Sequence, residues 1–389
     1  MSIPFSKPSL TEREAQATHD VITSGRLILG PEVRAFEAAL AAFTERRHAI
    51  AVTSGTSALQ LGLQAMGVDH TYSVIVPAYT WVATWNVAHW LGAEPILMDV
   101  DPNTYCLDPH DLERALSACT RPHRAILPVH MFGYRVDPDW LEATVDAHEL
   151  LLLGDGCCAF GGEHRGKRCG AWTPIECLSF HPRKVITTGE GGAILLDDDA
   201  LADRLTRLRD HGAIRSRSQR DQTTAGGLMT PEFPEPGHNL RMTEMQGALG
   251  RVQMARVEEL IAARRRVAST YDALLSRRAP WLSLPPGGED PGRVLTFYPV
   301  QLGFKGGTAH REVLVEALKK EGIASRPPMI HLLDQPFTQD SRRGHDFPGT
   351  RYLADHTLAL PFFPDLSDAQ IERVVSVIER HPPHTTRKE

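Results

Sequence analysis

The sequence predicts an α/β protein: a large domain with a mainly parallel sheet covered by helices, followed by a smaller C-terminal α+β domain. From about residue 47 to 197, short apolar runs alternate with helix-like segments, which is the pattern of strands joined by crossover helices. Several of these runs are apolar on both faces, as strands must be when helices cover both sides of the sheet. The 389 residues are enough for a large core and two unequal domains.

Seven apolar runs are the strand candidates. They span residues 48–53, 73–77, 95–100, 125–130, 150–155, 176–180 and 192–196. In a parallel sheet, ligands bind beyond the carboxyl ends of the strands. Thr53, Pro77, Asp155 and Phe180 stand at such ends, so we expect one shared site there. The polar, glycine-containing stretch 215–237 is predicted to be a surface loop.

Apolar residues at helical spacing from 245 to 274 predict one long amphipathic helix. Thr243 as its N-cap and Gln246 three residues later predict a capping box. After a proline- and glycine-rich break, a strand is expected at 295–302 and a helix at 310–321. We therefore assign a large domain to residues 1–250, whose N-terminal segment could pack on the small domain. The connecting helix and the small domain take residues 251–389.

Composition excludes several classes of function. The 42 basic and 48 acidic residues give a net charge of −6 without long blocks of one sign, which argues against nucleic acid as a partner. No apolar run reaches membrane-spanning length, and the first residues lack a signal-peptide pattern, so a cytoplasmic protein without membrane contact is expected. The six cysteines form no C-x-x-C pair and the 18 histidines no H-E-x-x-H pattern, so no metal site is expected.

A possible phosphate site follows the first strand candidate. Small hydroxyl residues at 53–57, among them Thr56 and Ser57, precede a helix-like run, and the free amides at a helix N-terminus bind anions. Ser179, beside a later loop, offers a further hydroxyl. The alternative is an ordinary helix N-cap.

Two further side chains suit a flat, cationic ring. Trp81 follows the strand candidate at 73–77 and could stack on such a ring, although a core position is the commoner fate of a tryptophan. Asp155 ends an apolar run, where a buried carboxylate needs a cationic partner such as a pyridinium. A capping role at the turn is the alternative for Asp155.

Lys184 lies in a short turn between an apolar run and the glycine-rich exit at 189–192. A lysine amine can form a Schiff base with an aldehyde cofactor, and a buried carboxylate can keep a pyridine nitrogen protonated. Lys184 and Asp155 together therefore point to pyridoxal phosphate (PLP). A lysine considered alone would more often be a solvated surface residue.

Together these motifs resemble the DegT/DnrJ/EryC1/StrS family of sugar aminotransferases, which are fold-type-I PLP-dependent transferases. The resemblance runs nearly end to end. It covers SG at 24–25, GPEV at 30–33, FE at 36–37, SGTSA at 54–58, PAYTW at 77–81, VHMFG at 129–133, SFHPRK at 179–184 and GHNLRMTEMQ at 237–246. The resemblance implies an enzyme that moves an amino group from glutamate or glutamine to a keto-sugar.

The resemblance also implies a role for each matching residue. Lys184 forms the internal aldimine, Asp155 pairs with the pyridine nitrogen and Trp81 stacks on the ring. Thr56, Ser57 and Ser179 hold the phosphate, and Asn239 reaches the phosphate of the neighbouring subunit's cofactor, which implies a homodimer. Segments containing Arg26, Arg326 and His331 approach the substrate in the family. These three are candidates for sugar, diphosphate or carboxylate contacts, and surface roles stay open for them.

One position departs from the family pattern. The family carries glutamine or histidine three residues after the pyridine-binding aspartate, in contact with the cofactor, whereas this chain has Cys158. A thiol is a much weaker hydrogen-bond partner than an amide or imidazole. The loop at 179–182 resembles the nucleotide-sugar branch more than the cyclitol branch. A sugar dehydratase of this fold would carry histidine at position 184. A cyclitol ketone aminotransferase, a non-catalytic PLP-binding regulator and a cofactor-free α/β binding protein are the remaining alternatives.

Overall fold

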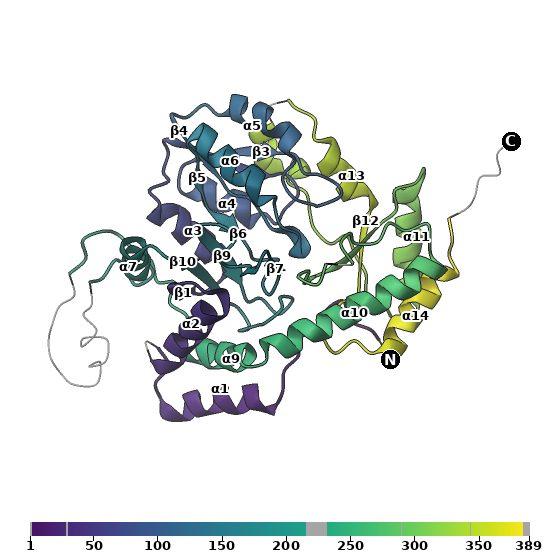
Figure 1. The fold of residues 1–389 in the computed structure, drawn as a ribbon, viewed down its shortest axis with the longest axis horizontal. Helices are drawn as coiled ribbons and strands as arrows, with labels where there is room; N and C mark the ends of the chain where they lie inside the picture. The colour runs from purple at the N-terminus through teal and green to yellow at the C-terminus, as the bar shows by residue number, and fades with distance from the viewer. Residues whose placement is uncertain (1, 29, 215–231, 289, 343, 384–389) are drawn as a thin grey trace.

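A computed structural model describes residues 2–28, 30–214, 232–288, 290–342 and 344–383. A central sheet is enclosed by helices, and the helix α10 (Val257–Arg278) runs from it to a smaller group of elements that includes α11, α14 and β12 (Figure 1). Most of the loop predicted at 215–237 lies outside the described residues. No helix within the described residues combines the length and apolar character that crossing a membrane requires.

The sheet is mainly parallel, as predicted. Strands β3, β2, β4 and β5 are parallel neighbours, and β6 runs parallel to β9. An isolated bridge between Val129 and Asp155 continues the pairing from the first group to the second. Strand β10 is the exception, because it is antiparallel to both β9 and β1. The strands are β1 (His48–Val52), β2 (Tyr72–Pro77), β3 (Glu94–Met98), β4 (His123–Ile126), β5 (Leu151–Leu152), β6 (Gly154–Asp155), β9 (Ile175–Ser179) and β10 (Gly192–Leu196).

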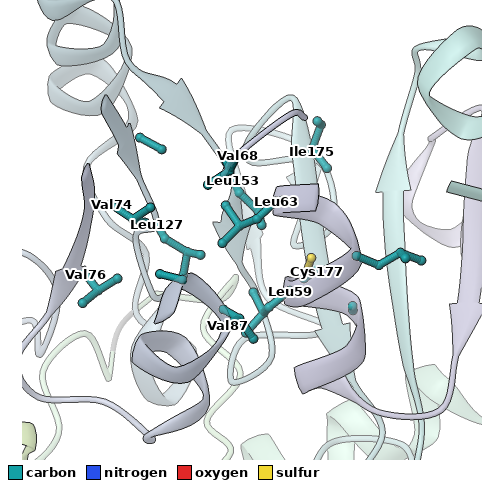
Figure 2. Close-up of a cluster of buried hydrophobic side chains, with 14 of the residues drawn as sticks. Leu59, Leu63, Val68, Val74, Val76, Val87, Leu127, Leu153, Ile175 and Cys177 are labelled. Carbon is teal, nitrogen blue, oxygen red and sulfur yellow. The ribbon is translucent and has the colours of Figure 1, made fainter. Parts of the chain in front are cut away.

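Alternating side chains of each strand enter two cores. On β2, Val74 and Val76 face one cluster and Ile75 faces another, as a strand with both faces covered requires. Figure 2 shows the first cluster, in which Leu59 and Leu63 meet the side chains of the strands. The helices of this face are α3 (Gly55–Ala65), α4 (Ala83–Trp90) and α7 (Asp199–Leu208). The opposite face carries α2 (Pro31–Thr44), α5 (Leu112–Ala118), α6 (Pro138–His148) and α9 (Glu244–Met254).

The single long helix predicted from residue 245 to 274 is wrong. The chain forms two helices, α9 and α10, separated at Ala255 and Arg256. The break lets the buried Arg256 guanidinium donate to Glu14 of α1 (Glu12–Ser24) at 2.8 Å and to Glu259 at 2.7 Å. Burial by itself would raise the pKa of Glu14, but hydrogen bonds from Thr11, Arg256 and Gln253 lower it to about 2. The capping box of Thr243 and Gln246 is present at the start of α9.

The C-terminal part forms its own core. Strand β11 (Tyr298–Gln301) pairs antiparallel with β12 (Thr357–Leu360), and α11 (Gly307–Lys320) and α14 (Asp368–Glu379) pack beside α10. Both the strand expected at 295–302 and the helix expected at 310–321 are present.

Two segments cross between the parts. The N-terminal Ile3 belongs to the C-terminal core, and its amide donates to Gly322 at 2.9 Å. In the other direction, Asp99 at the end of β3 accepts the amides of Gly349 and Thr350 at 2.8 and 2.7 Å. It thereby caps α13 (Pro348–His356). The shorter elements are β7 (Glu163–His164), β8 (Lys167–Arg168) and α12 (Gln339–Arg342). The domain boundary at 250/251 stays a prediction.

Candidate active site

Asp155 occupies the carboxyl end of β6 and is only 4% exposed. One carboxylate oxygen accepts the amide of Cys157 at 3.0 Å, and the other accepts the hydroxyl of Thr84 at 3.4 Å. Burial raises the pKa of Asp155, although these two residues and nearby Lys184 act in the opposite direction. An ionised carboxylate at this depth is therefore favourable when a cation lies against it.

Lys184 lies in the connection between β9 and β10. Its amide donates to the carbonyl of His181 at 2.8 Å, and the amide of Thr188 donates to Phe180 at 3.0 Å, which makes the connection compact. The Nζ of Lys184 lies 3.1 Å from the Sγ of Cys158. Burial acts to lower the pKa of Lys184, but Cys158, Cys157 and Asp155 outweigh it and raise the pKa above its ordinary value.

The amine and the carboxylate thus contact two consecutive residues. Lys184 touches Cys158 and Asp155 touches Cys157, so both groups serve one buried site. Cys158 is itself held in place, because its carbonyl accepts the hydroxyl of Thr296 at 3.0 Å. The position that departs from the family pattern therefore contacts the amine in this structure.

The predicted phosphate residues lie at the N-terminus of α3. Ser54 is the N-cap, and its hydroxyl accepts the amide of Ser57 at 3.0 Å, so the N-cap interpretation also holds. The hydroxyl of Ser57 lies 2.9 Å from those of Thr53 and Ser54. Thr56 is half-buried and is the second residue of α3. Amides in the first turn of a helix have no partner within the helix.

Gly55 brings Ser179 to this helix end. A Cβ on Gly55 would lie 2.8 Å from the Cβ of Ser179 and 3.0 Å from the Sγ of Cys157, closer than side chains pack. Only glycine therefore allows β9 to approach the first turn of α3. The result is a cradle of amides and hydroxyls beside Lys184 and Asp155, with a helix dipole that favours an anion.

Three predicted residues lie outside this buried group. Trp81 precedes α4 with its side chain 55% exposed. Asn239 is exposed, and its main chain forms a bridge with Asp210. Arg26 is exposed between α1 and α2. Their roles toward the cofactor or substrate therefore stay proposals.

The two C-terminal candidates have other surroundings. The guanidinium of Arg326 lies 4.5 Å from the ring centre of Phe5, and burial and the neighbouring Arg183 lower its pKa. The Nε2 of His331 lies 3.2 Å from a carboxylate oxygen of Asp334. Both residues therefore have structural contacts, which leaves their roles toward a substrate as proposals.

Sequence analysis missed two residues of the site. Thr84, the second residue of α4, donates to Asp155. Its hydroxyl also lies 3.2 Å from that of Thr80, which precedes the helix. Arg264 of α10 donates to the carbonyl of Lys184 at 2.7 Å. The helical spacing contained the signal for Arg264, because Ile261 and Val267 place residue 264 on the apolar face of that helix.

The residues present fit PLP. A primary amine and a buried carboxylate share one site, and an anion cradle that a Cβ on Gly55 would fill adjoins them. Across the described part of the chain, no group of three or more histidine, cysteine, aspartate or glutamate side chains is arranged to hold a metal ion.

Comparison with known proteins identifies the family. Residues 8–379 match the model of the DegT/DnrJ/EryC1/StrS aminotransferase family. The chain is 30% identical to S. venezuelae DesV, solved in complex with a ketimine intermediate, with 97% and 98% of the two chains covered and a TM-score of 0.85.

Two more distant structures share the fold. Helicobacter pylori PseC, an aminotransferase involved in the biosynthesis of pseudoaminic acid, is 24% identical, with 98% and 99% of the chains covered and a TM-score of 0.87. The Streptococcus pneumoniae aminotransferase Spr1654 has been solved in a PLP form, which is 23% identical over 98% of each chain with a TM-score of 0.86. The chain therefore belongs to the DegT/DnrJ/EryC1/StrS aminotransferase family, a family of sugar aminotransferases, and it is a PLP-dependent aminotransferase.

Proposed function

We propose that this aminotransferase moves the amino group of glutamate or glutamine onto a keto-sugar. The proposed acceptor is a nucleotide-linked keto-deoxysugar, used to make the amino-sugars of an antibiotic or a cell-surface glycan. The observation that carries the proposal is the pairing of Lys184 and Asp155 in one buried site, where they contact consecutive residues. The family supports a sugar as acceptor, and the involvement of PseC in pseudoaminic acid biosynthesis agrees with it.

The residues of the site divide the work. When bound, PLP supplies a protonated ring that withdraws electrons from the carbon bearing the amino group. Asp155 keeps the ring nitrogen protonated, because its buried carboxylate is stabilised by a cation. Thr56, Ser57 and Ser179 hold the phosphate at the start of α3. Trp81 stacks on the ring, and Asn239 reaches the phosphate held by a second subunit.

Lys184 is the proton carrier. As a free amine it would take the proton from the donor's Cα and deliver it to C4′ of the cofactor. The amine must therefore be held still beside the reacting carbon. Cys158 does this by accepting from Nζ at 3.1 Å. Arg26, Arg326 and His331 are the proposed contacts of the keto-sugar or of the donor carboxylate.

We further propose a homodimer that works in the cytoplasm. The exposed side chains of Trp81 and Asn239, both assigned to the cofactor, support a site that a second chain completes. All six cysteines are free thiols, which suits a reducing compartment.

Absorbance during half-reactions tests the proposal. Glutamate or glutamine should remove the visible band of the bound cofactor, and a nucleotide-linked keto-sugar should restore it. A panel that includes cyclitol ketones identifies the acceptor class, and restoration by cyclitol ketones alone would replace the sugar with a cyclitol. A band that no amino donor removes would instead indicate a non-catalytic regulator, and a protein that acquires no band after incubation with added PLP would contradict the assignment of Lys184.

A further inference from the structure

Arg264 is the largest fully buried side chain of the protein among the described residues, at 1% exposure. It lies on α10, whose buried positions also include Ile261, Val267 and Tyr271. A guanidinium among apolar side chains is costly unless something compensates for the loss of water. Its surroundings therefore indicate what the charge does.

The hydrogen bonds of Arg264 go to the lysine connection, which is the segment 180–191 between β9 and β10 that carries Lys184. Nη2 donates to the carbonyl of Lys184 at 2.7 Å and, more weakly, to that of Arg183 at 3.4 Å. Nε and Nη1 are buried without a hydrogen-bond partner among the described residues. Burial lowers the pKa of Arg264 to about 10, so the side chain still carries its charge near neutral pH.

Other buried arginines of this protein behave differently. Arg256 pairs with Glu14 at 2.8 Å, and the nearly buried Arg46 pairs with Asp197 at 2.6 Å. Such carboxylate pairs are what a structural arginine usually makes. Arg264 has no carboxylate partner in the described part of the chain and binds the main chain of the reacting lysine instead.

The far side of the guanidinium faces the C-terminal core. Its Cζ lies 5.5 Å from the ring centre of Phe362, two residues beyond β12. Phe362 is 2% exposed, and its main-chain amide donates to the carbonyl of Phe5 at 3.1 Å. Arg264 thus contacts both a buried aromatic ring and the segment between β9 and β10 that carries Lys184.

We propose that Arg264 is a positioning residue for Lys184: it holds the lysine's carbonyl and so sets where the Nζ amine points. This inference rests on the proposed role of Lys184, although it is independent of which acceptor is used. The amide of Lys184 is bound within its own turn, to His181, so Arg264 supplies the second anchor of the same residue. With both main-chain groups held, the amine moves only through its own side-chain torsions.

The test compares R264M, R264K and the matched control R277M. Arg277 lies on the same helix but is exposed, and its Nε donates only to Ala273 within that helix. The readout is the rate at which added PLP becomes covalently attached to Lys184 in cofactor-free protein, measured by borohydride trapping and mass. Near-UV circular dichroism and the melting temperature report the fold.

We expect attachment to slow by about ten- to a hundredfold in R264M, the range in which misplacing a reacting group by about 1 Å acts. R264K should recover part of the rate, because an ammonium still donates to a carbonyl but lacks the planar fork. R277M should match the wild type. In turnover, R264M should lower kcat more than it changes KM.

Attachment at the wild-type rate in a folded R264M would overturn the inference. If R264M does not fold, R264K decides: a slowed rate supports positioning, and a wild-type rate shows that the guanidinium serves folding alone. The assay contains no amino donor or acceptor. A wild type that attaches PLP at Lys184 but aminates no keto-sugar therefore refutes the proposed acceptor and leaves this inference standing.

Discussion

The two halves of the candidate site are built on different principles. Asp155, Thr84 and Cys158 are buried and Lys184 is half-buried, and the hydrogen bonds to oxygen around them, between 2.7 and 3.4 Å, come from the same chain. Trp81, Asn239 and Arg26 are exposed instead. One chain therefore supplies every contact described around the amine and the carboxylate, whereas the exposed side chains are those for which we propose contacts with the cofactor, a second subunit or the substrate.

The largest effect is expected from Lys184→Ala. Removing the proposed proton carrier should lower turnover by about 10²–10⁴-fold or more, the usual contribution of general acid–base catalysis. Steady-state kinetics with the best acceptor measure it. Lys167→Ala, an exposed lysine of β8, is the control and should retain full activity. Substantial turnover without Lys184 would remove the catalytic assignment of the buried half.

The next effect separates charge from hydrogen bonding at Asp155. Asp155→Asn keeps the shape but removes the charge that a cationic ring needs, so we expect kcat to fall by about 10²–10⁴-fold, since losing one partner of a buried pair costs about 3–5 kcal/mol. Thr84→Val removes only a 3.4 Å hydrogen bond and should cost about tenfold or less. An equal fall of kcat in both variants would mean that Asp155 contributes through its hydrogen-bond geometry rather than through its charge.

The third prediction concerns pH. Because the pKa of Lys184 is raised, its amine is protonated at neutral pH, and only the neutral amine attacks the cofactor aldehyde. Covalent attachment should therefore accelerate by about tenfold per pH unit until the pH reaches that pKa. Stopped-flow absorbance from pH 7 to 9 measures this slope.

Cys158→Ala sharpens the same experiment. Cys158 is a contact that raises the pKa of Lys184, so its removal should move the profile toward lower pH. Cys119→Ala, at the end of α5, is the control and should leave the profile in place. A profile that moves to higher pH, or does not move, in Cys158→Ala would contradict a contact between Cys158 and the Lys184 amine that raises its pKa.

A smaller effect is expected on the exposed half. Trp81→Ala should weaken PLP binding by about three- to tenfold, the value of one aromatic stacking contact, and Trp81→Phe should retain most of it. Trp90 is the matched control, because its side chain is equally exposed, at 55%. Equilibrium titration of cofactor-free protein gives the dissociation constants. No change in Trp81→Ala would place this residue outside the cofactor site.

The smallest effects belong to the proposed substrate contacts. Arg26→Ala and His331→Ala should raise the KM of the acceptor by at most about fivefold and leave kcat unchanged, because Arg26 is exposed, the His331 side chain is still 22% exposed, and ionic contacts open to solvent contribute about 0–1 kcal/mol. Arg277→Ala is a suitable control. A large fall in kcat in either variant would show that the exposed half takes part in the chemistry itself.

The sheet was largely predictable because its strands are apolar on both faces. The run at 192–196 coincides with β10, whereas the run at 150–155 is interrupted at Leu153. The break between α9 and α10 was not predictable. The apolar spacing continues across it, and the pairing of Arg256 with Glu14 that accompanies the break joins residues 242 positions apart.

For the site, residues next to strand ends were accessible to sequence reasoning. Lys184, Asp155 and Ser179 stand where the chain leaves the sheet, and their chemistry identifies them. Arg264 was not found, because it lies in a run of three arginines that composition alone marks as solvated. Its role depends on the packing of α10 against the lysine connection.

The reversed direction of β10 has a consequence for how the site can change. Ser179 and Gly192 are paired at the ends of the antiparallel strands β9 and β10. The twelve residues between them, 180–191, therefore form a hairpin loop and not a crossover connection. Phe180, Val185 and Ile186 of this loop are at most 3% exposed and belong to a core cluster, so adding or removing residues there would disturb packing as well as the loop-closure entropy. The length of this segment is therefore constrained twice, by the packing of its apolar side chains and by the position that the Lys184 amine must take.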